Sequence, residues 1–174
     1  MAIGPLATPL ILVLALSRAD EGRLEALRRA HYPPARNRSP AHLTLIRQLP
    51  GTQAPPLAGA LRAEAVRTPP FDLHVAAPVA RGNGVLLPVA GPELTDLHAR
   101  LADRFALLLL PADRIPFAPH VTIAGKLPPA EARRLAGQLA SDWKPWIARA
   151  QALALHAIAP DGRWTLLVRA ALGR

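Results

Sequence analysis

One arrangement of short segments occurs twice in this sequence, and it restricts the fold more than any other feature. PAHLTL at residues 40–45 returns as APHVTI at residues 118–123, which places His42 and His120 78 positions apart. Around each histidine the order is an apolar strand, a helix, the histidine-containing strand, a second helix and a further strand. Two copies with this period predict two similar lobes, because a solenoid needs at least three copies.

The apolar patterns and turn signals place the elements of both copies. The predicted strands are 10–16, 42–49, 71–77, 85–89, 120–124, 150–157 and 163–171, and the predicted helices are 21–30, 56–66, one opening at 91–93, and 128–139. Asp20 stands where the first helix needs an N-cap, and Asn83-Gly84 is a hairpin turn signal. We predict an α+β fold in which residues 1–174 form a single bilobal domain, with an internal repeat at roughly 10–80 and 84–171. Two antiparallel sheets face a central cleft, and helices cover the outside.

Composition narrows the class of protein and of partner. The chain has 174 residues, 51% of them hydrophobic, which is enough for a core, and it has no cysteine for disulfides or thiolate chemistry. The formal net charge is +9, and Lys126 and Lys144 are the only lysines among 21 basic residues. An arginine excess favours phosphate-bearing partners. The alternative is that the excess reflects only the general composition of the chain, which is also rich in Ala and Pro.

The apolar run LILVLAL at residues 10–16 resembles part of a signal peptide but lacks its other features. No basic residue precedes Arg18, and Pro5 and Pro9 interrupt the region before the run. A buried first strand fits better, and no segment has the length needed to cross a bilayer. We expect a cytoplasmic, monomeric protein.

Because side chains alternate along a strand, each motif places its histidine and its threonine on the same face. His42 and Thr44 point to one face of their strand, and the aliphatic residues between and after them point to the other. His120 and Thr122 have the same arrangement on the second strand. Approximate twofold symmetry would bring both pairs to one cleft. A neutral histidine could then take a proton from water while a protonated one gives a proton to a leaving alkoxide, and the hydroxyls could donate to phosphate oxygens. These four residues are the catalytic candidates.

Residues near the motifs are candidates for substrate binding. Lys126 continues the face of His120, and Gln48 holds the matching place after His42. Arg38, in the loop before the first motif, could reach a phosphate or remain in solvent. Phe117 could stack on a nucleobase, as could Tyr32 or Trp164. The candidates for substrate binding are therefore Lys126, Arg38, Gln48 and Phe117.

The paired His-x-Thr-hydrophobic motifs resemble the 2H phosphoesterase superfamily, and most closely its 2′-5′ RNA ligase-like group, which includes RNA 2′,3′-cyclic phosphodiesterases. The likeness extends over nearly the whole chain, through the first motif ending in LPG, the FDLHV strand and the final tryptophan-containing strand. It implies the bilobal fold and hydrolysis of 2′,3′-cyclic phosphates on RNA or nucleotides to 2′-phosphates, with no metal or cofactor. Where that group has a PH-x-T-x-x-R pattern, this chain has Gly125 followed by Lys126.

Other interpretations of the motifs stay open. The same cleft could bind RNA or nucleotides without catalysis, or join 2′-5′ ends by the reverse reaction. The two histidines could also bind a metal ion, but the sequence has no third ligand at a suitable spacing. Symmetry does not decide which histidine is the acid, and we favour His120 as base and His42 as acid. His74 and His98 are expected to face solvent, and His156 to be structural.

Overall fold

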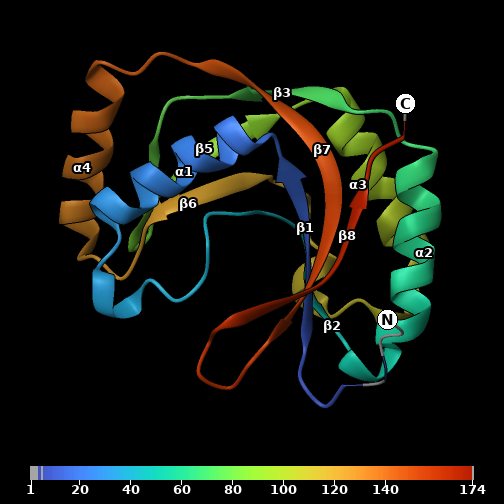
Figure 1. Cartoon of the computed structure of the whole chain (residues 1–174). Coiled ribbons are helices and arrows are strands. Elements are labelled where there is room, and N and C mark those ends of the chain that lie inside the picture. Colours follow the sequence, from blue (N-terminus) through green and yellow to red (C-terminus); the bar gives the residue numbers. More distant parts are fainter. Residues whose placement is uncertain (1–3, 5, 174) are drawn as a thin grey trace.

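The predicted alternation of strands and helices is present in the computed structural model, which describes residues 4 and 6–173 (Figure 1). Within that part the strands are β1 (Leu10–Leu16), β2 (Leu43–Leu49), β3 (Phe71–Val75), β4 (Val79–Arg81), β5 (Gly84–Ala90), β6 (His120–Ala124), β7 (Trp146–Ile158) and β8 (Trp164–Ala171). The α-helices are α1 (Arg18–His31), α2 (Ala54–Val66), α3 (Pro92–Arg104) and α4 (Pro129–Ser141).

The start of α1 corrects one sequence prediction. Ser17, not Asp20, is the N-cap, because its hydroxyl accepts a hydrogen bond from the Asp20 backbone N–H at 3.2 Å. The Asp20 carboxylate instead accepts from Trp146 Nε1 at 3.1 Å and from the Arg149 backbone N–H at 2.9 Å. Asp20 thus joins the first turn of α1 to β7.

All strands pair antiparallel, which confirms the predicted α+β class. The pairing order is β1-β2-β6-β5-β3-β7-β8; β4 pairs with β5, and β1 also pairs with β7. Six strands therefore form a closed ring of pairings, and the two predicted sheets are joined into one. The reason is β7, which at 13 residues is long enough to pair with β3 through Trp146–Ala150 and with β1 through Ala150–Ala157.

The pairing order has an internal symmetry. Exchanging β1 with β5, β2 with β6, and β3 with β7 leaves the ring of pairings unchanged. The order of elements along the chain, β1-α1-β2-α2-β3 and β5-α3-β6-α4-β7, follows the same exchange. This arrangement is the one that an internal repeat at 10–80 and 84–171 would produce, and the repeat itself stays a prediction.

Helices lie on two sides of the strands and cover a common core. Figure 1 shows α1 and α4 on one side and α2 and α3 on the other. Helix α1 packs against β6, α4 against β4 and β5, and α2 against β7 and β8. The stripe Leu94, Leu97 and Leu101 of α3 is fully buried. No helix in the described residues is long and apolar enough to cross a membrane.

The first strand is buried on both faces, which explains its unbroken apolar sequence. Leu10, Leu12, Leu14 and Leu16 belong to the main core. The residues between them form a second, smaller cluster with residues of β7 on the other face of the strands, consisting of Ile11, Val13, Ala15, Ala152 and Ala154. Trp164 packs against this second cluster at its edge. The same face lines a pocket together with His42 of the first motif.

Candidate active site

The register between β2 and β6 brings the two motifs together. Leu43 lies opposite Val121, and both are buried in the main core. In an antiparallel pair this register places His42 across from Thr122, and Thr44 across from His120, on the other face. All four of these side chains are half-buried. The predicted catalytic residues therefore occupy neighbouring positions on one face of β2 and β6, with His42 immediately before the first residue of β2 and not within the strand, as its prediction at 42–49 had it.

Both imidazoles are held by the same contact. Nδ1 of His42 donates to the carbonyl oxygen of Pro40 at 2.7 Å, and Nδ1 of His120 donates to that of Ala118 at 2.8 Å. A carbonyl oxygen only accepts, so the proton of each neutral ring lies on Nδ1. Nε2 is then left to exchange protons with a substrate. In each motif the acceptor is two residues before the histidine.

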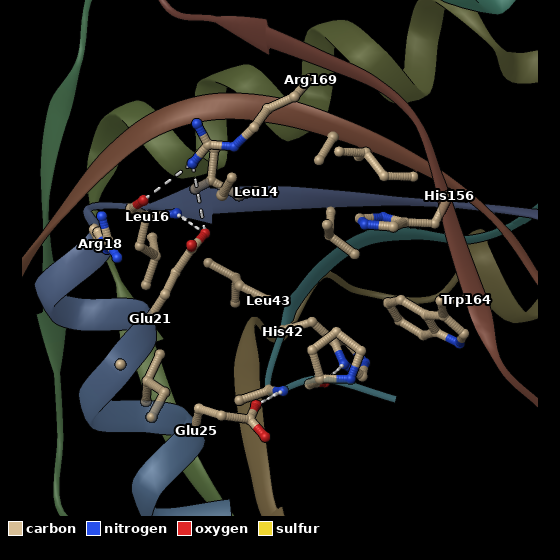
Figure 2. A pocket seen from close by; sticks show the side chains of 18 of the residues that line it. Leu14, Leu16, Arg18, Glu21, Glu25, His42, Leu43, His156, Trp164 and Arg169 are labelled. Atoms are coloured by element: carbon tan, nitrogen blue, oxygen red, sulfur yellow. Dashed lines mark hydrogen bonds and ion pairs between the residues drawn. The ribbon is translucent and has the colours of Figure 1, made fainter. Parts of the chain in front are cut away.

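Burial changes the protonation of His42. Trp164 packs against this ring with centroids 4.4 Å apart (Figure 2). Loss of water around the ring lowers the pKa of His42 to about 4, although the hydrogen bond to Pro40 opposes the shift. His42 is therefore neutral at pH 7. The positive charges that lower its pKa further are those of Arg28, His156 and His120.

Replacing Trp164 with alanine should raise the pKa of His42 toward 6.5, because water would reach the exposed face of the ring. We expect a shift of roughly one to two pH units. NMR titration of the His42 ring measures this without any substrate. The matched control is Trp143→Ala, because the Trp143 ring packs against that of Trp146, with centroids 5.5 Å apart, and not against His42. An unchanged His42 titration in Trp164→Ala would show that the indole does not control the ring.

Arg28 connects α1 to both motifs, and sequence reasoning did not assign it to the site. Its guanidinium is buried; Nη1 donates to the Thr122 carbonyl at 2.8 Å, Nε to Asn37 Oδ1 at 2.8 Å and Nη2 to Ser39 Oγ at 3.2 Å. It also lies 4.1 Å above the Tyr32 ring. Arg28 thus fixes the second motif strand and the loop before the first. Its place on the apolar stripe of the helix, four residues after Leu24, is a signal that could have revealed it.

Three pockets surround the paired motifs. The large pocket, about 530 Å³, lies beside His42 between α1 and the strands β1, β7 and β8, with His156 and Trp164 in its wall (Figure 2). The basic pocket, about 280 Å³, lies beside His120 and Thr122. The small pocket, about 50 Å³, includes Thr44 and His120. His156, expected to be structural, therefore lines the large pocket next to the first motif.

Two of the four predicted substrate-binding residues lie in these pockets. Lys126 lines the basic pocket, and Phe117 lines the small pocket. Phe117 stacks on His98 at 3.6 Å between ring centroids, so one of its faces is already covered. His98 is consequently half-buried, which corrects its predicted exposure, whereas His74 is exposed as predicted.

The other two predicted residues lie outside the linings of these three pockets. Arg38 Nη1 donates to the Asp161 carbonyl at 2.9 Å, which ties the loop before the first motif to the turn between β7 and β8. Gln48 is exposed, and its backbone N–H donates to Asp113 Oδ2 at 3.3 Å. Its expected alignment with Thr44 fails because the register of β2 against β1 shifts, so that Leu45 and Ile46 are both buried. The same irregularity brings Arg47 into the small pocket.

Gly125 stands where the resemblance placed an arginine, and the Tyr32 side chain lies close to it. A Cβ at Gly125 would lie 3.0 Å from Tyr32 Cε2 and 3.1 Å from its hydroxyl oxygen. The aromatic ring therefore closes over the backbone at this position. Among the described residues, no group of three or more His, Cys, Asp or Glu side chains is arranged to hold a metal ion.

Comparison with solved structures defines the fold. TT0787 of Thermus thermophilus aligns with a TM-score of 0.66 and 19% identity over 95% of this chain and 99% of its own. LigT of E. coli complexed with NADP+ aligns with a TM-score of 0.64 and 23% identity over 96% and 99%. A structure described as a phosphoesterase aligns with a TM-score of 0.63 and 20% identity over 97% and 100%. The chain therefore has the fold of the LigT-like phosphoesterases.

The sequence assigns the family. Residues 16–162 match the 2′-5′ RNA ligase superfamily, a stretch that includes both His-x-Thr motifs. The chain belongs to this superfamily of 2H phosphoesterases. A search of curated proteins finds no significant match.

Proposed function

We propose that this protein hydrolyses a 2′,3′-cyclic phosphate, on an RNA end or a nucleotide, to a 2′-phosphate by acid–base catalysis between His42 and His120. The observation that carries the proposal is the matched pair of Nδ1–carbonyl hydrogen bonds, 2.7 and 2.8 Å long. They leave an Nε2 atom on each ring for proton transfer from positions on adjacent strands. A cyclic phosphate between the two rings would have a base on one side and an acid on the other.

The lowered pKa of His42 favours a division of roles opposite to the one preferred from sequence. A ring that is neutral at pH 7 has a free lone pair on Nε2 and is suited to remove a proton from water. Water attacks phosphorus as His42 Nε2 takes its proton, the bond from phosphorus to O3′ breaks, and His120 in its protonated, imidazolium form gives the proton on Nε2 to O3′. The hydroxyls of Thr44 and Thr122 donate to the non-bridging oxygens as negative charge increases.

The comparisons support a nucleotide as the substrate. LigT of E. coli has been crystallised with NADP+, 3′-AMP and ATP, and it shares the fold of this chain. The net charge of +9 is suited to a phosphate-bearing partner. Ligation of 2′-5′ ends is the reverse type of reaction and would use the same two histidines. Whether hydrolysis or ligation occurs then depends on which RNA ends the substrate supplies.

The proposal is tested by incubating the protein with the four nucleoside 2′,3′-cyclic phosphates, with and without a chelator. We expect turnover of at least one to the 2′-monophosphate, at a rate that the chelator leaves unchanged. Binding of these compounds without turnover would contradict the proposal and favour a binding module. Loss of turnover in the chelator would overturn the metal-free mechanism.

A further inference from the structure

The two larger pockets beside the motifs differ in charge. The large pocket contains three arginines and two glutamates, and both glutamates have partners. Glu21 lies 3.7 Å from Arg169, and Glu25 lies 3.7 Å from Arg29. Glu25 also accepts a hydrogen bond from the Ala41 backbone N–H at 2.8 Å. Because its charges are largely compensated and its floor is apolar, this pocket is suited to an uncharged nucleoside.

The basic pocket carries positive charge without a carboxylate. Arg81 and Lys126 line it, and no Asp or Glu does. Within the described part of the chain, neither cation is within 4.0 Å of a carboxylate oxygen. Two uncompensated cations in one pocket attract an anion, and guanidinium matches phosphate oxygens in particular.

Two turns place these cations together. Arg81 ends β4 at the hairpin turn of Gly82 and Asn83, and Lys126 follows β6. The Leu127 backbone N–H donates to the Asn83 carbonyl at 3.0 Å, which ties one turn to the other. Lys126 has a φ of 62°, a left-handed conformation that is uncommon for a residue with a side chain. The backbone at Lys126 is therefore fixed by its neighbours, as at many ligand-contacting positions.

The basic pocket extends beyond the reacting centre. Ala124 lies four residues after His120 on β6, a span of about 13 Å at the rise of an extended strand. Ala124 pairs with Val85, next to the hairpin that carries Arg81. The pocket thus runs from the motif to a pair of cations further along the strand. With a volume of about 280 Å³, the pocket has room for a phosphate group at these cations in addition to one beside His120.

We propose that the basic pocket binds a second phosphate of the substrate, the one on the 5′ side of the nucleotide that carries the cyclic phosphate. This inference rests on the proposed function. It defines the preferred substrate class as 2′,3′-cyclic phosphate nucleotides that also have a 5′-phosphate, whether a free nucleotide or the 3′ end of an RNA. Arg81 and Lys126 hold that phosphate, while the nucleoside lies toward the large pocket.

Three substrates test the proposal: adenosine 2′,3′-cyclic phosphate, its 5′-phosphorylated form, and the dinucleotide ending in the same cyclic phosphate. We expect kcat/KM to be roughly tenfold higher with the 5′-phosphate, mainly through KM, because the contact forms equally in the ground and transition states. In the double variant Arg81→Gln/Lys126→Gln the ratio should fall to near one. The control Arg62→Gln, an exposed arginine on α2, should keep the wild-type ratio.

The dinucleotide identifies the source of the phosphate. A preference for it indicates an RNA end, and a preference for the 5′-monophosphate alone indicates a free nucleotide; either result supports the pocket. Equal kcat/KM on all three substrates, or a ratio that survives the double variant, overturns it. If no substrate is hydrolysed, the proposed function fails, and calorimetric binding still decides the inference. Adenosine 2′,5′-bisphosphate should then bind roughly tenfold more tightly than adenosine 2′-phosphate, and only when both cations are present.

Discussion

Alanine in place of His42 or His120 should lower kcat/KM on a 2′,3′-cyclic phosphate by roughly a thousandfold, because each substitution removes one of the two proton transfers. The double variant should be little worse than either single one, since the two groups act as a unit. Initial rates with a cyclic nucleotide measure the loss.

The control for these substitutions is His74→Ala, an exposed histidine on β3. Its kcat/KM should stay close to that of the wild type. Near-wild-type activity in either motif variant would contradict the paired mechanism, provided that both variants give the circular dichroism spectrum of the folded protein.

Methionine in place of the buried Arg28 should lower the free energy of unfolding by about 3 kcal/mol, because it leaves several half-buried polar partners without a hydrogen-bond donor. The Thr122 carbonyl and Asn37 Oδ1 each lose a contact of 2.8 Å. Urea unfolding measures the change. Activity measured well below the unfolding midpoint should also fall, since Arg28 positions the second motif strand and the loop before the first.

Arg29→Met is the matched control for this change, because Arg29 is exposed on the same helix and lies 3.7 Å from Glu25. Its effect should be within about 0.5 kcal/mol, as is usual for surface substitutions. Equal losses of stability in the two variants would show that the buried network contributes little.

Much of the fold could be predicted from the sequence because local pattern determines it. The apolar run at 10–16 and the motif strand at 120–124 have the predicted bounds. The closure of six strands into one ring could not be predicted, since it depends on the continuation of β7 across Trp146–Arg149, where the sequence WIAR has no distinctive strand pattern. Pairing between residues far apart in the chain leaves no local signal.

The catalytic candidates were accessible from the sequence because strand alternation and repetition together specify their shared face. The substrate-binding candidates were less accessible. Gln48 was placed by assuming a regular strand, and the shift of register in β2 breaks that assumption. Arg81 reaches the neighbourhood of the motifs only through the pairing of β4 with β5. Trp164 was named as a stacking candidate, but its contact with His42 depends on the pairing of β8 with β7. Contacts of this kind follow from tertiary structure and have no spacing to detect.

The most direct test of the central claim is hydrolysis of an RNA end carrying a 2′,3′-cyclic phosphate in water enriched in oxygen-18, followed by phosphorus NMR and mass spectrometry. The mechanism predicts a 2′-phosphate containing one oxygen-18 atom, formed equally in the presence of chelator and absent with the His42→Ala/His120→Ala double variant. A 3′-phosphate product, or a 2′-phosphate formed at the same rate by the double variant, would contradict it.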